Sequence, residues 1–304
     1  MTARTSPEEA PASAGRARRL AAWLHAHPHA RLRLLLSAPL VWLVGVYIGS
    51  LTILLLNAFW TSDSFTGKVN PFDWSLAAFE QIIGNDVYRT IALRTLGMAA
   101  LVTVTDVLLA FPIAYYMARV ASRRTRRLLV VAILMPLWAS YLVKIFAWRT
   151  IFLGNGFLSW MLAPFGIDGP GTDEIANSWI VFSYLWLPYM ILPIYTGLER
   201  VPGSLLEASA DLGARAGTTF RRVVLPLVLP SLIAGSIFTF SLTLGDYIIP
   251  QIVGNSRLFI GMAVYAHQGT AGNIPLAAAF TVVPIVIMGV YLYVARRMGA
   301  FDAL

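Results

Sequence analysis

The feature that most constrains this chain is a series of apolar runs, each about as long as a membrane crossing. A helix needs about 20 apolar residues to cross the roughly 30 Å hydrocarbon layer of a bilayer. The chain is 58% hydrophobic and 12% charged, about half the charged fraction of a soluble domain. We therefore predict an all-α, polytopic membrane protein with six transmembrane helices. The expected spans are Leu34–Ala58, Ile91–Met117, Leu128–Arg149, Ser178–Leu198, Ser231–Val253 and Leu276–Ala295.

Prolines lie within several of these spans, and the segments between spans are expected to contain short elements of their own. We expect Pro112 to break the second span, and Pro136 lies within the third. Between spans, residues 59–90 and 254–275 are expected to form outer loops, the first with a short surface helix. Residues 157–165 are expected to form an amphipathic piece at the membrane interface.

The distribution of positive charge predicts which side of the membrane each loop occupies. Most of the 23 Lys and Arg residues lie in residues 1–33, after the second span, in the loop 199–230 and at the C-terminus. The positive-inside rule then places both termini in the cytoplasm. It also explains the net charge of +8 without nucleic acid binding. The predicted division is a cytoplasmic tail (1–33), a membrane domain (34–298) and a cytoplasmic end (299–304).

The loop 199–230 reads as two short helices. Ser204 and Glu207 have the spacing of a capping box, which predicts a helix that Gly213 closes. A second helix, capped by Thr218 or Thr219, would be limited by Pro226. The resulting structure would be a compact polar knob between two membrane spans.

This loop resembles the "EAA" loop of ABC importer permeases. Five residues match that pattern in register, while Ser209 and Val223 replace an Ala and an Ile of the pattern. The resemblance implies a type I ABC importer permease fold in which the loop is a coupling helix that docks on a cytoplasmic ATPase. It assigns ATPase coupling to Glu207, Ala208, Ser209, Asp211, Gly213, Leu225 and Pro226. The competing interpretation is an ordinary solvated connector in which Glu207 only caps its own helix.

We expect no catalytic residue, cofactor site or metal site in this chain. The only Gly-Lys pair, Gly67-Lys68, lacks the earlier glycine of a P-loop and is followed by Val69. The chain has no Cys, which excludes thiolate metal ligands. Three histidines in the tail, at positions 25, 27 and 29, lack a fourth ligand. ATP and Mg²⁺ are therefore expected on a separate ATPase subunit.

Charged residues inside the spans are the remaining candidates for function, because each costs about 2.5–3.5 kcal/mol on insertion scales. Asp106 is expected near the middle of the second span, where it serves either interhelical hydrogen bonding or a cation. Asp246 lies in the fifth span, where Gly245 and Pro250 weaken the helix. Lys144 in the third span lies at a similar depth. Asp246 and Lys144 are thus either a structural ion pair or, for Asp246, a substrate contact.

Several aromatic residues accompany these acids and would suit an organic cation through cation–π contacts if they face a central path. Membrane-interface packing is the alternative. The tentative substrate path consists of Asp246, Tyr247, Trp138, Tyr141, Lys144, Trp186, Tyr189 and Asp106.

The segments 136–148, 186–193 and 244–254 resemble the third, fourth and fifth spans of spermidine/putrescine-type permeases. The resemblance implies a first permease subunit that imports a small organic cation, most simply a polyamine. It also implies a second permease as heterodimer partner, two copies of an ABC ATPase and an extracytoplasmic solute-binding protein, in the inner membrane of a bacterium. The alternatives are another solute (4-aminobutyrate, 2-aminoethylphosphonate, an opine or ferric iron), a membrane scaffold or channel, and a homodimer.

Overall fold

The computed structural model describes residues 15, 23, 25–63, 68–154, 156–166, 174–254, 258–269 and 271–299. The chain divides into two compact units, Met1–Leu56 and Asn57–Leu304. In the described part of the chain, five helices are long and apolar enough to cross a membrane, and a bent helix pair brings the number to six. The predicted all-α membrane class is therefore confirmed.

The first unit contains the predicted first span. Helix α2 (Pro28–Val41), a π-helical segment (Trp42–Ile48) and α3 (Gly49–Asn57) follow one another. Their apolar side chains are exposed, with Val41 at 70% and Trp42 at 71%, as suits a helix whose solvent is lipid. Most of the predicted tail, residues 1–33, lies outside the described residues.

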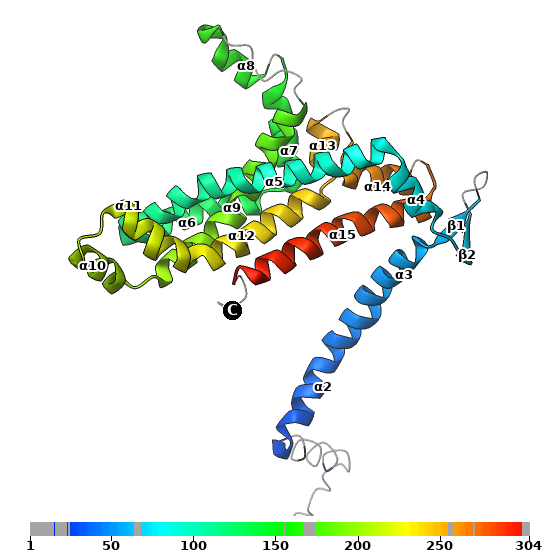
Figure 1. Ribbon diagram of the computed structural model, residues 1–304, viewed down its shortest axis with the longest axis horizontal. Helices are drawn as coiled ribbons and strands as arrows, with labels where there is room; N and C mark the ends of the chain where they lie inside the picture. Colours follow the sequence, from blue (N-terminus) through cyan, green and yellow to red (C-terminus); the bar gives the residue numbers. More distant parts are fainter. Residues whose placement is uncertain are drawn as a thin grey trace, which may run out of the picture. The chain divides into compact units, whose positions relative to one another are not determined.

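The second unit is built around long helices that run side by side (Figure 1). Helix α9 packs against both α5 and α12, and α15 packs against α12. Their bounds are α5 (Asp86–Tyr115), α9 (Glu174–Arg200), α12 (Leu225–Gly245) and α15 (Ile274–Arg297). Side-chain caps fix the starts of α5 and α15, where Asn85 Oδ1 accepts from Val87 N at 2.9 Å and Asn273 Oδ1 accepts from Leu276 N at 3.1 Å.

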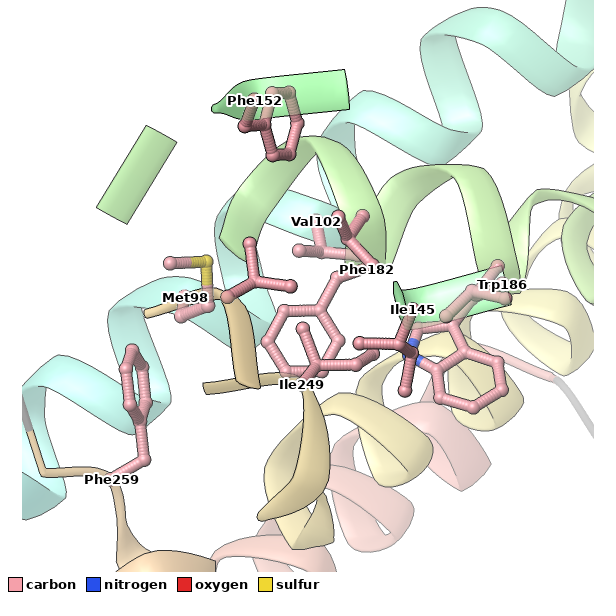
Figure 2. Close-up of a cluster of buried hydrophobic side chains, with 11 residues drawn as sticks. Met98, Val102, Ile145, Phe152, Phe182, Trp186, Ile249 and Phe259 are labelled. Atoms are coloured by element: carbon pink, nitrogen blue, oxygen red, sulfur yellow. The ribbon is translucent and has the colours of Figure 1, made fainter. Parts of the chain in front are cut away.

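Two buried clusters hold these helices together. In the first, Phe182 of α9 lies among Met98 and Val102 of α5 and Ile145 and Ile249 from shorter helices (Figure 2). The second lies further along the same helices and consists of Ala110, Ala114, Met117, Met190, Ile191, Ile194, Leu198, Val201, Val224 and Val228. The second cluster therefore extends to the start of the loop 199–230.

Two prolines leave their helices continuous, contrary to the sequence prediction. Helix α5 passes Pro112 and continues as a π-helical segment, η2 (Tyr116–Val120). The helix after the loop starts at Ala216 and runs without a break to Gly245, through α11 (Ala216–Thr219), the π-helical η4 (Phe220–Val224) and α12. A π-turn shifts the backbone hydrogen bonds, and it lies just before the position where Pro226 has no N–H to donate.

The predicted third span, Leu128–Arg149, is two helices and not one. Helix α6 (Arg123–Trp138) and α7 (Tyr141–Phe152) meet at an angle of 93°. Ala139 and Ser140 between them are extended. The Pro136 carbonyl at the end of α6 accepts from the Ala139 N–H at 3.3 Å and from the Lys144 Nζ at 3.1 Å, so the lysine ammonium is a second donor at this helix end.

The predicted fifth span is also divided. Helix α12 ends at Gly245, Asp246 is extended, and α13 (Ile248–Val253) follows. The predicted weakening of the helix at this point is confirmed.

The segments predicted to form outer loops contain more structure than the sequence indicated. A strand pair, β1 (Trp60–Ser62) and β2 (Val69–Trp74), precedes the predicted short helix, α4 (Ala77–Gly84). Residues 157–165 form α8 (Phe157–Leu162) and a 3₁₀ turn (Ala163–Phe165). Helix α14 (Ile260–Gly269) lies in a predicted loop and packs against α15.

Candidate functional site

The break between α12 and α13 places a carboxyl group against an aromatic side chain of α7. The Tyr141 hydroxyl donates to Asp246 Oδ2, and Asp246 Oδ1 accepts from the backbone N–H of Ile249 at 2.9 Å. A carboxylate offers about four lone-pair positions, and these two bonds use about half of them. Asp246 therefore fixes α7 to the start of α13 while it retains capacity for another donor.

The Tyr141 ring that contacts this carboxyl group is the first of three aromatic rings in contact with one another. The Tyr141 ring is stacked on that of Trp186, with centroids 6.1 Å apart and planes 18° apart. Tyr189 meets Trp186 edge-on at 6.0 Å. Trp186 is 8% exposed, and its Nε1 has no hydrogen-bond partner among the described residues. Four residues predicted for the path thus form one cluster, in which a cation would meet both a carboxylate and π faces.

Helix α14 packs against the residues of the same break, Gly245 to Tyr247. The Tyr247 ring is stacked on Tyr265 at 5.1 Å, with planes 13° apart. Gly261 lies so close that a Cβ built on it would be 2.9 Å from the Asp246 carbonyl oxygen. Tyr265 and Gly261 were not among the residues predicted for the path, because residues 254–275 were expected to form a loop.

Three other residues predicted for the path lie elsewhere. Trp138 is 91% exposed at the end of α6. Lys144 does not form the ion pair with Asp246 that the sequence suggested, because its ammonium donates to the Pro136 carbonyl. Asp106 is fully buried in α5, faces Ser183 of α9, and its carboxyl oxygens lack a hydrogen-bond partner within the described chain.

The loop predicted to dock an ATPase contains α10 (Gly203–Asp211). The predicted capping box is absent, because α10 begins at Gly203 after Pro202 and has no side-chain cap. Its end is as predicted: Gly213 has φ +73°. Gly213 N donates to Ala210 O at 2.8 Å and Ala214 N donates to Ser209 O at 3.0 Å, which is a Schellman motif.

A hydrogen bond between side chains joins α10 to the next helix. Ser209 Oγ and Thr219 Oγ1 are 2.8 Å apart, and Ser209 is 9% exposed. Glu207 and Asp211 are exposed on the same knob, as are Ala208 and Gly213. Leu225 and Pro226 are the first two residues of α12, so the matching residues of the EAA pattern lie at both ends of one small helical unit.

Comparison with known proteins decides the class of this molecule. Residues 110–300 match the family "Binding-protein-dependent transport system inner membrane component". The chain belongs to this family. It is a permease, a membrane component of an ABC importer, as the EAA loop predicted.

Individual relatives agree with this assignment. The permease is 48% identical to the inner membrane ABC transporter permease protein YdcU of Escherichia coli (strain K12), over 91% of this chain and 93% of that protein. It is 31% identical to the spermidine/putrescine transport system permease protein PotB of Haemophilus influenzae, over 70% of this chain and 76% of that protein. The predicted resemblance to the spermidine/putrescine type is confirmed.

The fold agrees as well. A chain from the crystal structure of a bacterial ABC transporter involved in the import of alginate matches with a TM-score of 0.69 at 17% identity. The match covers 92% of the permease and 99% of that chain. At this identity the match supports the type I permease fold alone.

Proposed function

We propose that this permease carries a polyamine through an ATP-driven importer and that Asp246 contacts an ammonium group of the cargo. The observation that carries the proposal is the cluster in which Tyr141 contacts the Asp246 carboxylate and is followed by the rings of Trp186 and Tyr189. A carboxylate with aromatic faces is the environment that attracts an alkylammonium ion. The PotB relative, named for spermidine/putrescine transport, supports the same cargo class.

The partners in this proposal are those of a complete importer. A second permease subunit completes the path, two cytoplasmic ATPase copies bind ATP and Mg²⁺, and an extracytoplasmic binding protein delivers the amine. Both termini and the knob formed by α10 lie on the ATPase side, which agrees with the distribution of Lys and Arg. One of the solved relatives is described in complex with a periplasmic protein bound to alginate pentasaccharide, which is a precedent for such delivery.

The proposed mechanism is alternating access. Closure of the ATPase dimer moves the knob formed by α10, and the attached helices rock so that the path opens outward. The binding protein then releases the amine toward Asp246. Because Asp246 lies at a helix break, a small displacement of α13 relative to α12 changes the position of the carboxylate without unwinding either helix.

The test uses the complex purified through this chain, reconstituted in lipid vesicles with its binding protein. ATP hydrolysis and uptake are measured with putrescine, spermidine, 4-aminobutyrate and 2-aminoethylphosphonate. We expect stimulation by a polyamine. Stimulation by one of the other solutes alone refutes the polyamine assignment, and a purified complex without any ATPase refutes the importer assembly. Glu207→Arg should abolish stimulated hydrolysis if α10 docks on the ATPase.

The role of Asp246 is tested by Asp246→Asn at saturating concentrations of loaded binding protein, so that capture by the binding protein does not limit the rate. The amide retains an oxygen for the Ile249 N–H, and it removes the charge together with the oxygen that accepts from the Tyr141 hydroxyl. A charge-assisted hydrogen bond contributes about 1.5–3 kcal/mol, so uptake should fall by about 10-fold to 150-fold. Glu80→Gln, which neutralises an exposed carboxylate of α4, is the control and should leave uptake unchanged. An undiminished rate in the Asp246 variant refutes the contact.

A further inference from the structure

Two arginines hold the joint between α9 and α10. Arg119 lies in η2, at the end of the helix that begins as α5, and its Nη2 donates to the carbonyls of Leu198 at 2.8 Å and Val201 at 2.7 Å. In a continuing helix the Leu198 carbonyl would accept from the backbone N–H four residues later, but that residue is Pro202, which has no N–H. The Leu198 carbonyl accepts from the Val201 N–H at 3.3 Å, and the Arg119 guanidinium adds a shorter bond in place of the one that Pro202 cannot make.

Arg126 of α6 completes the arrangement. Its Nε donates to the Met117 carbonyl at 2.9 Å and its Nη2 to the Ala118 carbonyl at 3.1 Å. Its Nη1 forms an ion pair of 3.1 Å with Glu199 of α9, which also accepts from the Tyr195 hydroxyl. We name Arg119, Arg126 and Glu199 the joint clamp. It connects the end of α5, the start of α6 and the last turn of α9.

The far side of the α10 knob is attached to α5 as well. Phe220, just after α11, meets Phe111 of α5 edge-on, with ring centroids 5.3 Å apart. The Ser209–Thr219 hydrogen bond holds α10 to α11. The chain therefore enters α10 through a joint held by Arg119 and leaves it through a segment packed on Phe111. Both attachments lead to the same helix.

A neighbouring arginine shows that these contacts are selective. Arg124 is exposed, and no hydrogen bond or ion pair of its side chain is present in the described part of the chain. Positive charge on this side of the membrane thus needs no such contacts to satisfy the positive-inside rule. The bonds of Arg119 and Arg126 instead fix backbone carbonyls at helix ends.

We infer that the joint clamp transmits displacement of α10 to α5 and α6, so that Arg119 and Arg126 are positioning residues for transport. This inference rests on the proposed docking of α10 on an ATPase. Without the clamp, the non-helical residues 201 and 202 would let α10 move while α5 and α6 stay in place. With the clamp, movement of α10 also moves α6, whose other end leads to Tyr141.

The test measures amine uptake per ATP hydrolysed in the reconstituted complex, alongside assembly and hydrolysis without binding protein. Arg119→Gln should assemble and hydrolyse ATP normally, yet uptake per ATP should fall about tenfold, the equivalent of ~1.4 kcal/mol. Arg119→Lys keeps an ammonium that can donate to both carbonyls and should recover most of the coupling. Arg124→Gln, the matched control, should behave as the parent.

Other outcomes overturn the inference. Parental uptake per ATP in Arg119→Gln shows that the clamp does not transmit movement. If Arg119→Gln does not assemble, Arg126→Gln is measured in the same way, and failure of both to assemble assigns the clamp to folding alone. If amines stimulate ATP hydrolysis neither in the parent nor in Arg124→Gln, the proposed importer function is refuted. This result differs from failure of the clamp, in which the parent and Arg124→Gln are stimulated and only uptake per ATP in Arg119→Gln is informative.

Discussion

The close contact between α14 and the helix break gives a sharp prediction. In Gly261→Ala the new Cβ would be 2.9 Å from the Asp246 carbonyl oxygen, 3.0 Å from its carbonyl carbon and 3.1 Å from the Gly245 oxygen. All three are backbone atoms, so no side-chain rotation relieves the contact. The backbone must open by roughly 0.5 Å to reach an ordinary carbon–oxygen separation. Overpacking of this kind costs about 1–3 kcal/mol.

Uptake at saturating loaded binding protein measures the consequence. If this free energy destabilises the position of Asp246 that transport requires, uptake should decrease by about 5-fold to 150-fold. The unfolding temperature of the solubilised complex should also decrease. Gly245→Ala is the control, because a Cβ at that position meets nothing within 4 Å. It should be neutral or slightly stabilising, since Ala favours a helix over Gly. Parental uptake and parental unfolding temperature in Gly261→Ala would refute the reasoning.

Two further predictions concern the knob formed by α10 and helix α14. Gly213→Val should reduce the free energy of unfolding by about 1–2 kcal/mol, because Val is strained in the left-handed conformation, and it should lower stimulated ATP hydrolysis. Gly217→Ala is the control, because a Cβ at that position meets nothing within 4 Å, and it should hydrolyse ATP as the parent does. Equal hydrolysis in the two variants would contradict this prediction. Burial lowers the pKa of His267 below its usual 6.5, so the folded protein favours the neutral imidazole. The free energy of unfolding is therefore not reduced by this histidine above about pH 6.5, the pKa in the unfolded chain. It decreases as the pH falls from this value toward the lower pKa of the folded protein. The unfolding temperature of the complex should fall between about pH 7.5 and 5.5, less so in His267→Phe, and an equal decline in both would exclude this histidine.

The sequence predicted the spans because length and apolar content suffice to define a membrane helix. It also predicted the weakened helix around Asp246 and the closing glycine of α10, since both depend on local residues such as Gly245 and Gly213. The 93° bend between α6 and α7 was not predictable in this way. The contact across the bend, in which the Lys144 ammonium reaches the Pro136 carbonyl, joins residues that no local pattern pairs.

The members of the candidate site could be predicted from the sequence, but their grouping could not. Tyr141, Asp246, Trp186 and Tyr189 were all selected from the sequence, but their grouping depends on how α7, α9 and the broken helix meet. The capping box failed because Ser204 has the right spacing to Glu207 but lies within the helix and not before it. The joint clamp carried no local signal, since Arg119 and Arg126 were indistinguishable from other positive residues at the ends of spans.

The two structural bonds of Asp246 have a consequence for redesign of this permease toward another cargo. One carboxyl oxygen holds the first turn of α13 and the other holds Tyr141 of α7. Replacing the acid to accommodate an anionic or neutral solute would therefore disturb the backbone at the same time as the selectivity. In the described part of the chain, the side chains of Trp186 and Tyr189 make no such hydrogen bond to the backbone. Redesign for another cargo should therefore begin at Trp186 and Tyr189 and leave Asp246 unchanged.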